Sequence, residues 1–255
     1  MTEQSKFKTH SYEFNRRSQI FCYLIHGFSS TTGDVNELAK FLGEKGFHTR
    51  ADLLYGHGTT VKDCNSIKYT EWFSQVEIGL AEMLSQSETV YVVGVSMGST
   101  LALHLASMFP VKGIVIGSPA LKTFADWKLK YLNPFLCHII PSLLKTGVHK
   151  DRDKENIQLH GYESYPMKGV NQYLKIIDEV IPNINKITAP ILIQHGLKDD
   201  TASKENIDII HDNVKSDLLQ IKKYENTGHH IFEEGAEQKQ IFEDLLRFIQ
   251  KVENA

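Results

Sequence analysis

The chain has 255 residues, a formal net charge of -3, 41% hydrophobic residues and 23% charged residues, a balance that gives no reason to expect nucleic acid or an anionic membrane surface as a partner. No apolar run approaches the ~20 residues of a membrane span, and the N-terminus carries no apolar stretch of signal-peptide length. The three cysteines, Cys22, Cys64 and Cys137, are too few and odd in number for a disulfide framework, so we expect a cytoplasmic protein.

Strand and helix patterns alternate along the chain. Dense apolar runs predict strands at 20–25, 47–54, 89–95, 111–116, 190–196 and 218–224. Amphipathic spacing predicts helices at 35–45, 69–85, 99–109, 203–214 and 238–252, the first of them capped by Asp34. Such alternation builds a mostly parallel sheet covered on both faces, with its site at the carboxyl ends of the strands. The sequence therefore predicts a single α/β domain over residues 1–255.

Residues 121–185 break this alternation. They contain no convincing strand, and they interleave aromatic and aliphatic residues with lysine and proline. A segment of roughly sixty residues far exceeds the usual connection of a few residues plus one helix. We therefore expect a helical insertion that forms a small cap over the sheet.

Residues Gly94-Val95-Ser96-Met97-Gly98 fit the pattern G-x-S-x-G between a predicted strand and a predicted helix. At such a turn the glycines let the backbones pass, and the serine side chain is lifted into the open. Ser96 is then placed to act as a nucleophile, and the N–H of Met97 at the helix N-terminus can bind the resulting anion. An ordinary turn of small residues is the alternative interpretation.

Two later strand ends supply a histidine and a carboxylate. Gly228 frees the loop after the last predicted strand to turn His229 inward, which makes His229 the favoured base and His230 the alternative. After the preceding strand, Asp199 is the favoured acid and Asp200 the alternative. A carboxylate there would hold the tautomer of the histidine and stabilise its cation. The chain order of serine, acid and histidine is that of α/β-hydrolases.

The first strong strand ends in His26-Gly27-Phe28, and the N–H of Phe28 is a candidate second donor to an oxyanion. Other kinds of site lack the residues that they require. Residues 151–155 lack the glycine and the final glutamate of a calcium loop, and His57 has no second ligand at helical spacing, so we favour loop packing near the site for it. No phosphate-binding glycine loop is present. We therefore expect no metal and no cofactor.

Five segments occur in order across almost the whole chain: LIHGFSSTTGD, LYGHGTT, GVSMGS, ILIQHGLKDD and ENTGHHIFEE. Together they resemble the bacterial carboxylesterase and monoacylglycerol lipase group of the α/β-hydrolase superfamily. The resemblance implies a cofactor-free serine hydrolase of small-molecule esters, with a small helical cap over an acyl pocket. The family motifs fall on Ser96, Asp199 and His229, with oxyanion N–H groups at Phe28 and Met97.

The cap carries a further element of the resemblance. In the lipase branch, a Tyr-Glu pair ahead of a proline contributes a glutamate to glycerol binding, and residues 162–166 (YESYP) carry that pattern over to Glu163 as a substrate-binding residue. Apolar side chains that could line the acyl pocket, or instead pack the cap onto the sheet, are Phe124, Trp127, Phe135 and Leu136. The chain departs from the family at Ser99, where a second glycine is common, and we expect slight crowding of the helix-strand contact.

The resemblance leaves several activities open. The serine at the elbow argues against epoxide hydrolases and haloalkane dehalogenases, which carry an aspartate there. Thioesterase, cinnamoyl or feruloyl esterase and cofactor-free haloperoxidase activities share the same parts. A non-catalytic ligand-binding protein on this fold is the alternative from a different class.

Overall fold

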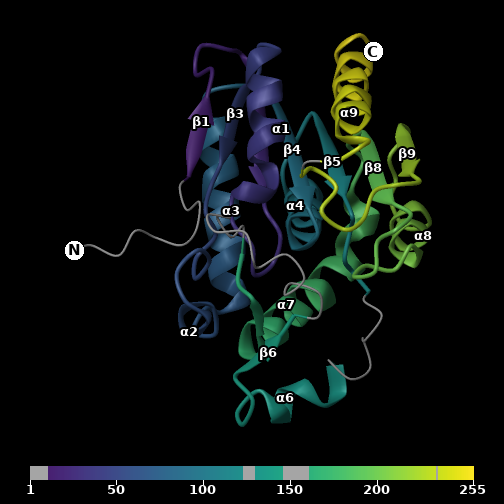
Figure 1. Cartoon of the computed structure of the whole chain (residues 1–255). Helices are drawn as coiled ribbons and strands as arrows, with labels where there is room; N and C mark the ends of the chain where they lie inside the picture. The colour runs from purple at the N-terminus through teal and green to yellow at the C-terminus, as the bar shows by residue number, and fades with distance from the viewer. Residues whose placement is uncertain (1–10, 123–129, 146–160, 234) are drawn as a thin grey trace.

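A computed structural model describes residues 11–122, 130–145, 161–233 and 235–255. Its centre is a seven-stranded sheet of order β1-β3-β2-β4-β5-β8-β9 (Figure 1). Only the edge pair of β1 and β3 is antiparallel, and the other neighbouring strands run parallel. The strands are β1 (Tyr12–Phe14), β2 (Ile20–Ile25), β3 (His48–Ala51), β4 (Thr89–Val95), β5 (Gly113–Gly117), β8 (Ile191–Gly196) and β9 (Leu219–Tyr224).

Helices cover both faces of the sheet, because each central strand is apolar on both sides. In β2, for example, Cys22 and Leu24 face one core cluster, while Phe21, Tyr23 and Ile25 face the other. The first cluster is closed by α1 (Gly33–Glu44) and α9 (Gln238–Glu253). The second is closed by α3 (Tyr69–Leu84), α4 (Met97–Met108) and α8 (Glu205–His211). The predicted mostly parallel sheet with two covered faces is confirmed.

The start of α1 differs from the prediction. The helix begins at Gly33 with Thr32 at the N-cap position, and Thr32 makes no side-chain capping bond. The expected cap, Asp34, lies inside the first turn, and its carboxylate accepts the N–H of Gly27 at 3.0 Å and the hydroxyl of Ser30. The prediction that Asp34 caps the helix was therefore wrong, because its carboxylate instead accepts hydrogen bonds from the loop that follows β2.

Two short elements near the first strands were not predicted. Strand β1 has only three residues, and α2 (Val61–Cys64) has four. Neither is long enough to show a clear apolar period. Among the helices of the described residues, none combines the length and apolarity that crossing a bilayer requires.

Between β5 and β8, the described part of residues 121–185, called the cap segment below, is not purely helical. Strand β6 (Ser142–Leu144) pairs antiparallel with β7 (Ser164–Pro166), so the expectation of no strand in this segment was wrong. Helices α6 (Asn133–Leu136) and α7 (Met167–Val180) complete it, and the 3₁₀ helix η2 (Ile181–Lys186) leads towards β8. In Figure 1 α6, β6 and α7 lie together at one end of the sheet.

Helix α7 joins the cap segment to the sheet domain. The Tyr173 hydroxyl on α7 lies 2.6 Å from the Ala120 carbonyl and 3.1 Å from the Thr100 hydroxyl on α4. The outer part of the cap segment is different, because Phe135 is 76% exposed and Leu136 is 43% exposed. Those two side chains are therefore exposed rather than packed onto the sheet, and their part in an acyl pocket stays a prediction. The other two candidates for the acyl pocket, Phe124 and Trp127, lie outside the described residues.

Candidate active site

The turn between β4 and α4 holds Ser96 in a strained backbone conformation, with φ 55° and ψ -117°. A non-glycine residue at positive φ costs free energy and persists only where its surroundings fix it. The Ser96 N–H donates to the Gly117 carbonyl at 3.0 Å. A Cβ atom on Gly94 would lie 2.1 Å from the Gly98 carbonyl oxygen, and one on Gly98 would lie 2.0 Å from that of Ile25. Both glycines of the motif are therefore required by backbone contacts.

Ser99 was expected to crowd this turn, but its side chain is accommodated by hydrogen bonds. Its side chain is fully buried, and its hydroxyl lies 2.9 Å from the Gly94 carbonyl and 2.8 Å from that of Gly117. The hydroxyl therefore has acceptors on both neighbouring strands, β4 and β5. A serine at this position connects the start of α4 to the sheet, which a glycine cannot do.

The structure brings Ser96, His229 and Asp199 into one hydrogen-bonded chain. The distance from Ser96 Oγ to His229 Nε2 is 2.9 Å, and the distance from His229 Nδ1 to Asp199 Oδ2 is 2.9 Å. The side chain of Asp199 is fully buried, while that of His229 is 12% exposed. The alternatives lie elsewhere, since Asp200 contacts the Thr201 hydroxyl and His230 pairs with Glu233.

Asp199 is held as a carboxylate. Burial raises its pKa, but the hydrogen bond and charge of His229 and the N–H groups of Ala202 and Thr201 outweigh burial and leave the pKa below its usual range. Those two N–H groups lie 2.8 and 2.9 Å from Asp199 Oδ1. An ionised carboxylate that accepts from Nδ1 leaves Nε2 of His229 free to accept a proton from the serine hydroxyl.

The loops that carry the acid and the histidine meet at the end of β8. Gly196, the last residue of β8, has no room for a side chain, because a Cβ there would lie 2.3 Å from the Thr227 carbonyl oxygen. The N–H of Lys198 donates to the same carbonyl at 3.0 Å. This close approach explains how residues separated along the chain come to lie side by side at the carboxyl edge of the sheet.

Both expected oxyanion donors lie at this edge. Met97 is the first residue of α4, so its N–H has no acceptor within the helix. A Cβ on Gly27 would lie 3.3 Å from the Cβ of Ser96, which places the backbone leading to Phe28 against the serine. The Phe28 ring stacks on Tyr173 of α7 at 5.9 Å between centroids. The cap segment therefore helps to orient the loop that carries Phe28.

Glu163 lies just before β7, and its carbonyl accepts the N–H of Lys145 at 3.0 Å. The preceding residue anchors this stretch to the sheet domain: the Tyr162 N–H donates to the Ser29 carbonyl at 2.8 Å, and its hydroxyl donates to that of Gly56 at 2.6 Å. Glu163 thus directly precedes a strand and lies in a stretch that adjoins the loop after β2. Its role in substrate binding stays a prediction.

Two buried histidines lie behind the site: His57, for which loop packing was expected, and His26, for which no role was predicted. Burial lowers the pKa of His26 to about 3 and that of His57 to about 4, so both are neutral near neutral pH. His26 Nε2 accepts the Leu54 N–H at 3.0 Å, and its ring lies 5.0 Å from that of His57. The His57 ring also packs near Trp72 and Phe28, in agreement with the expected loop packing. In the sequence, a glycine follows each of the two histidines (His26-Gly27 and His57-Gly58), and this pattern is the only signal that indicated them.

Comparisons with known proteins agree with this architecture. The chain is similar to a carboxylesterase of Bacillus subtilis (strain 168), with 25% identity over 90% of this chain and 92% of that protein. It is also similar to a thermostable monoacylglycerol lipase of Bacillus sp. (strain H-257), with 26% identity over 89% of each chain. A solved structure of a metagenome-derived lipolytic enzyme superimposes with a TM-score of 0.84 at 21% identity, covering 95% of this chain and 98% of that chain.

The predicted α/β-hydrolase fold and the predicted resemblance to the carboxylesterase and monoacylglycerol lipase group are confirmed by these comparisons. A family model described as serine aminopeptidase S33, within the hydrolases, matches residues 17–236. Since that match spans most of the sequence, the chain belongs to the serine aminopeptidase S33 family of hydrolases.

Proposed function

We propose that this protein is a carboxylic ester hydrolase that uses Ser96 as nucleophile, His229 as general base and acid, and Asp199 as the residue that orients His229. The observation that carries the proposal is the chain of two 2.9 Å contacts from Ser96 Oγ through His229 to Asp199 Oδ2. Nucleophile, base and orienting acid within hydrogen-bond reach are the arrangement that activates a serine.

In the proposed reaction, Ser96 Oγ attacks the ester carbonyl while His229 Nε2 takes the hydroxyl proton. The N–H groups of Phe28 and Met97 bind the oxyanion of the tetrahedral intermediate. His229 then protonates the leaving alcohol, and an acyl group remains on Ser96. A water molecule, deprotonated by His229, attacks this acyl-enzyme and releases the acid, which restores the serine hydroxyl. Asp199 stays ionised throughout and stabilises the imidazolium that forms in each half-reaction.

Short- to medium-chain acyl esters, including monoacylglycerols, are the proposed substrates. The named relatives are a carboxylesterase and a monoacylglycerol lipase, and the Phe28 ring of the proposed oxyanion loop packs against the buried Trp72 and Tyr173 rings. Glu163, which directly precedes β7 and adjoins the loop after β2, is the proposed contact for a glycerol hydroxyl. The three cysteines are buried and unpaired, which supports the proposed cytoplasmic location.

A panel of substrates tests this proposal and separates it from its alternatives. Turnover of p-nitrophenyl esters from acetate to laurate, of monoacylglycerols, of feruloyl esters, of acyl-thioesters and of an aminoacyl anilide is measured for the wild type and for Ser96→Ala. We expect the acyl esters to be preferred, with a dependence on chain length, and Ser96→Ala to lose nearly all turnover. Equal rates in Ser96→Ala, or tight retention of an ester without any hydrolysis, would refute the proposed function.

A further inference from the structure

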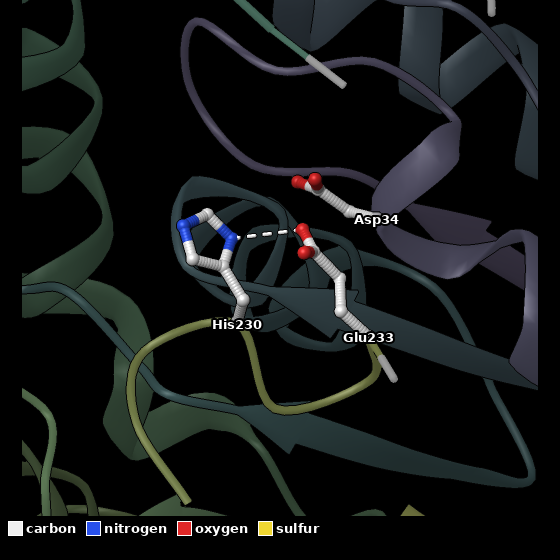
Figure 2. Close-up of side chains that lie close together, drawn as sticks. All are labelled: Asp34, His230 and Glu233. Carbon is white, nitrogen blue, oxygen red and sulfur yellow. Dashed lines mark ion pairs between the residues drawn. The ribbon is translucent and has the colours of Figure 1, made fainter. Parts of the chain in front are cut away.

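Next to the proposed triad, three side chains with metal-binding atoms converge from two distant parts of the sequence. Asp34 comes from the first turn of α1, and His230 and Glu233 come from the loop after β9 (Figure 2). One ligand atom of each residue lies within 4.8 Å of the other two. His230 Nδ1 lies 3.0 Å from a carboxylate oxygen of Glu233.

Asp34 forms the buried side of this cluster. The residue is only 6% exposed, and its carboxylate is fixed by the Gly27 N–H and the Ser30 hydroxyl, one on each oxygen. A carboxylate has about four lone-pair positions, so these two bonds leave further acceptor capacity on the same oxygens. In Figure 2 the carboxylate lies next to the Glu233 carboxylate and the His230 ring. The cluster therefore has a rigid inner ligand and two outer ligands on one loop.

Charges of both signs meet at this position, because His230 pairs with Glu233 and the charge of Lys145 interacts with those of Asp34 and Glu233. Two carboxylates and one imidazole that approach within 4.8 Å of one another offer three ligand atoms to one divalent cation, which would take the place of the proton between His230 and Glu233.

We propose that Asp34, His230 and Glu233 bind a divalent transition-metal ion of the zinc type. An imidazole nitrogen with two carboxylate oxygens is a ligand set that Zn²⁺ accepts, whereas Ca²⁺ and Mg²⁺ favour oxygen ligands alone. With Zn–N and Zn–O distances of about 2.0 to 2.2 Å, tetrahedral ligand atoms lie about 3.4 Å apart. The 3.0 Å pair of His230 and Glu233 already has nearly this spacing, and the Asp34 oxygen, within 4.8 Å of both, requires a shift of at most about 1.4 Å.

The position of the site links two loops of the active site. His230 directly follows His229, and Asp34 holds the N–H of Gly27, which precedes Phe28. An ion bound by all three ligands fixes the spacing between the histidine loop and the proposed oxyanion loop. Metal binding is therefore expected to stabilise the folded chain, because it ties together segments that lie far apart in the sequence.

The test uses the full chain freed of metal with a chelator and titrated with ZnCl₂ in a calorimeter, with the melting temperature measured in parallel. The variants His230→Gln and Glu233→Gln each remove one ligand from an outer, partly exposed position, where little loss of folding is expected. His211→Gln is the matched control, because His211 Nδ1 also pairs with a carboxylate, that of Asp212 at 2.9 Å. Among the described residues, that exposed pair belongs to no group of three ligands.

We expect one Zn²⁺ per chain with a dissociation constant in the micromolar range, and a higher melting temperature with the metal. His230→Gln and Glu233→Gln each weaken binding at least tenfold and abolish the rise in melting temperature, whereas His211→Gln changes neither. CaCl₂ in the same titration binds at least tenfold more weakly. Wild-type Zn²⁺ binding that is absent, or that survives unchanged in both ligand variants, shows that the cluster is only an internal ion pair and overturns the proposal. Equal binding of Ca²⁺ overturns the assignment to a transition metal.

Discussion

The buried, neutral state of His57 predicts how the stability of the protein changes with pH. Its pKa is about 4 in the folded chain, whereas an unfolded histidine titrates near 6.5. The unfolded chain therefore binds more protons than the folded chain when the pH falls below about 6.5. The free energy of unfolding contributed by His57 is complete above that pH, and it is lost as the pH falls towards 4.

The size of this loss follows from the two pKa values. At pH 5 the unfolded imidazole is mostly protonated and the folded one mostly neutral, which costs about 2 kcal/mol of unfolding free energy relative to pH 8. His26, with a pKa of about 3, adds about 2 kcal/mol in the same direction. A typical domain has only about 5 to 15 kcal/mol in total, so the effect is measurable.

The variant His57→Asn isolates this contribution. Asparagine keeps a donor that can reach the Tyr55 carbonyl, which His57 Nδ1 approaches at 3.1 Å, but it does not titrate. Urea unfolding at pH 8, 6.5 and 5 is measured for the wild type, His57→Asn and the exposed control His211→Asn. We expect His57→Asn to be less stable at pH 8, because a packed ring is lost, but to lose about 2 kcal/mol less than the wild type between pH 8 and 5.

The control His211→Asn should follow the wild-type pH dependence. If His57→Asn and the wild type instead lose the same free energy over this range, His57 is not held neutral by burial, and the reasoning is refuted.

Three further predictions concern the proposed site. Asp199→Asn should lower kcat by on the order of 10⁴ and Asp200→Asn by less than tenfold, and similar losses in both variants would contradict the assignment of the acid. Ser99→Ala removes the hydroxyl donor from two buried carbonyls, of which that of Gly117 keeps the Ser96 N–H, and should lower the unfolding free energy by about 1 kcal/mol in urea, whereas an unchanged value would show that its hydrogen bonds contribute nothing. Gly98→Ala should greatly lower the melting temperature while Gly235→Ala, where nothing lies within 4 Å of an added Cβ, should not, and equal melting temperatures would disprove the backbone contact at the elbow.

The sequence predicted the parallel core well because buried parallel strands are continuous apolar runs. Strand β4 and strand β2 were predicted with their observed bounds, 89–95 and 20–25. The candidate triad could also be predicted from the sequence, since each member follows a strand and the carboxyl ends of parallel strands share one edge of the sheet. The structure distinguishes Asp199 from Asp200 through the contact with His229, which no local pattern encodes.

Features that depend on distant partners were not predicted. Asp34 resembles a helix cap locally, but its carboxylate bonds to the loop after β2 instead. The pairing of β6 with β7 joins two three-residue strands, each too short for a period-2 signal. Ser99 was expected to crowd the turn because the acceptors of its hydroxyl, the carbonyls of Gly94 and Gly117, become visible only once β4 and β5 are side by side.

Covalent labelling of Ser96 tests the central claim most directly. The wild type and Ser96→Ala are each treated with a fluorophosphonate, and the adduct is counted by intact mass spectrometry and located by peptide mapping. The proposed mechanism predicts one adduct per chain, on Ser96, and none on Ser96→Ala under the same conditions. An adduct on another residue, or equal labelling of the two proteins, would contradict the assignment of Ser96 as the nucleophile.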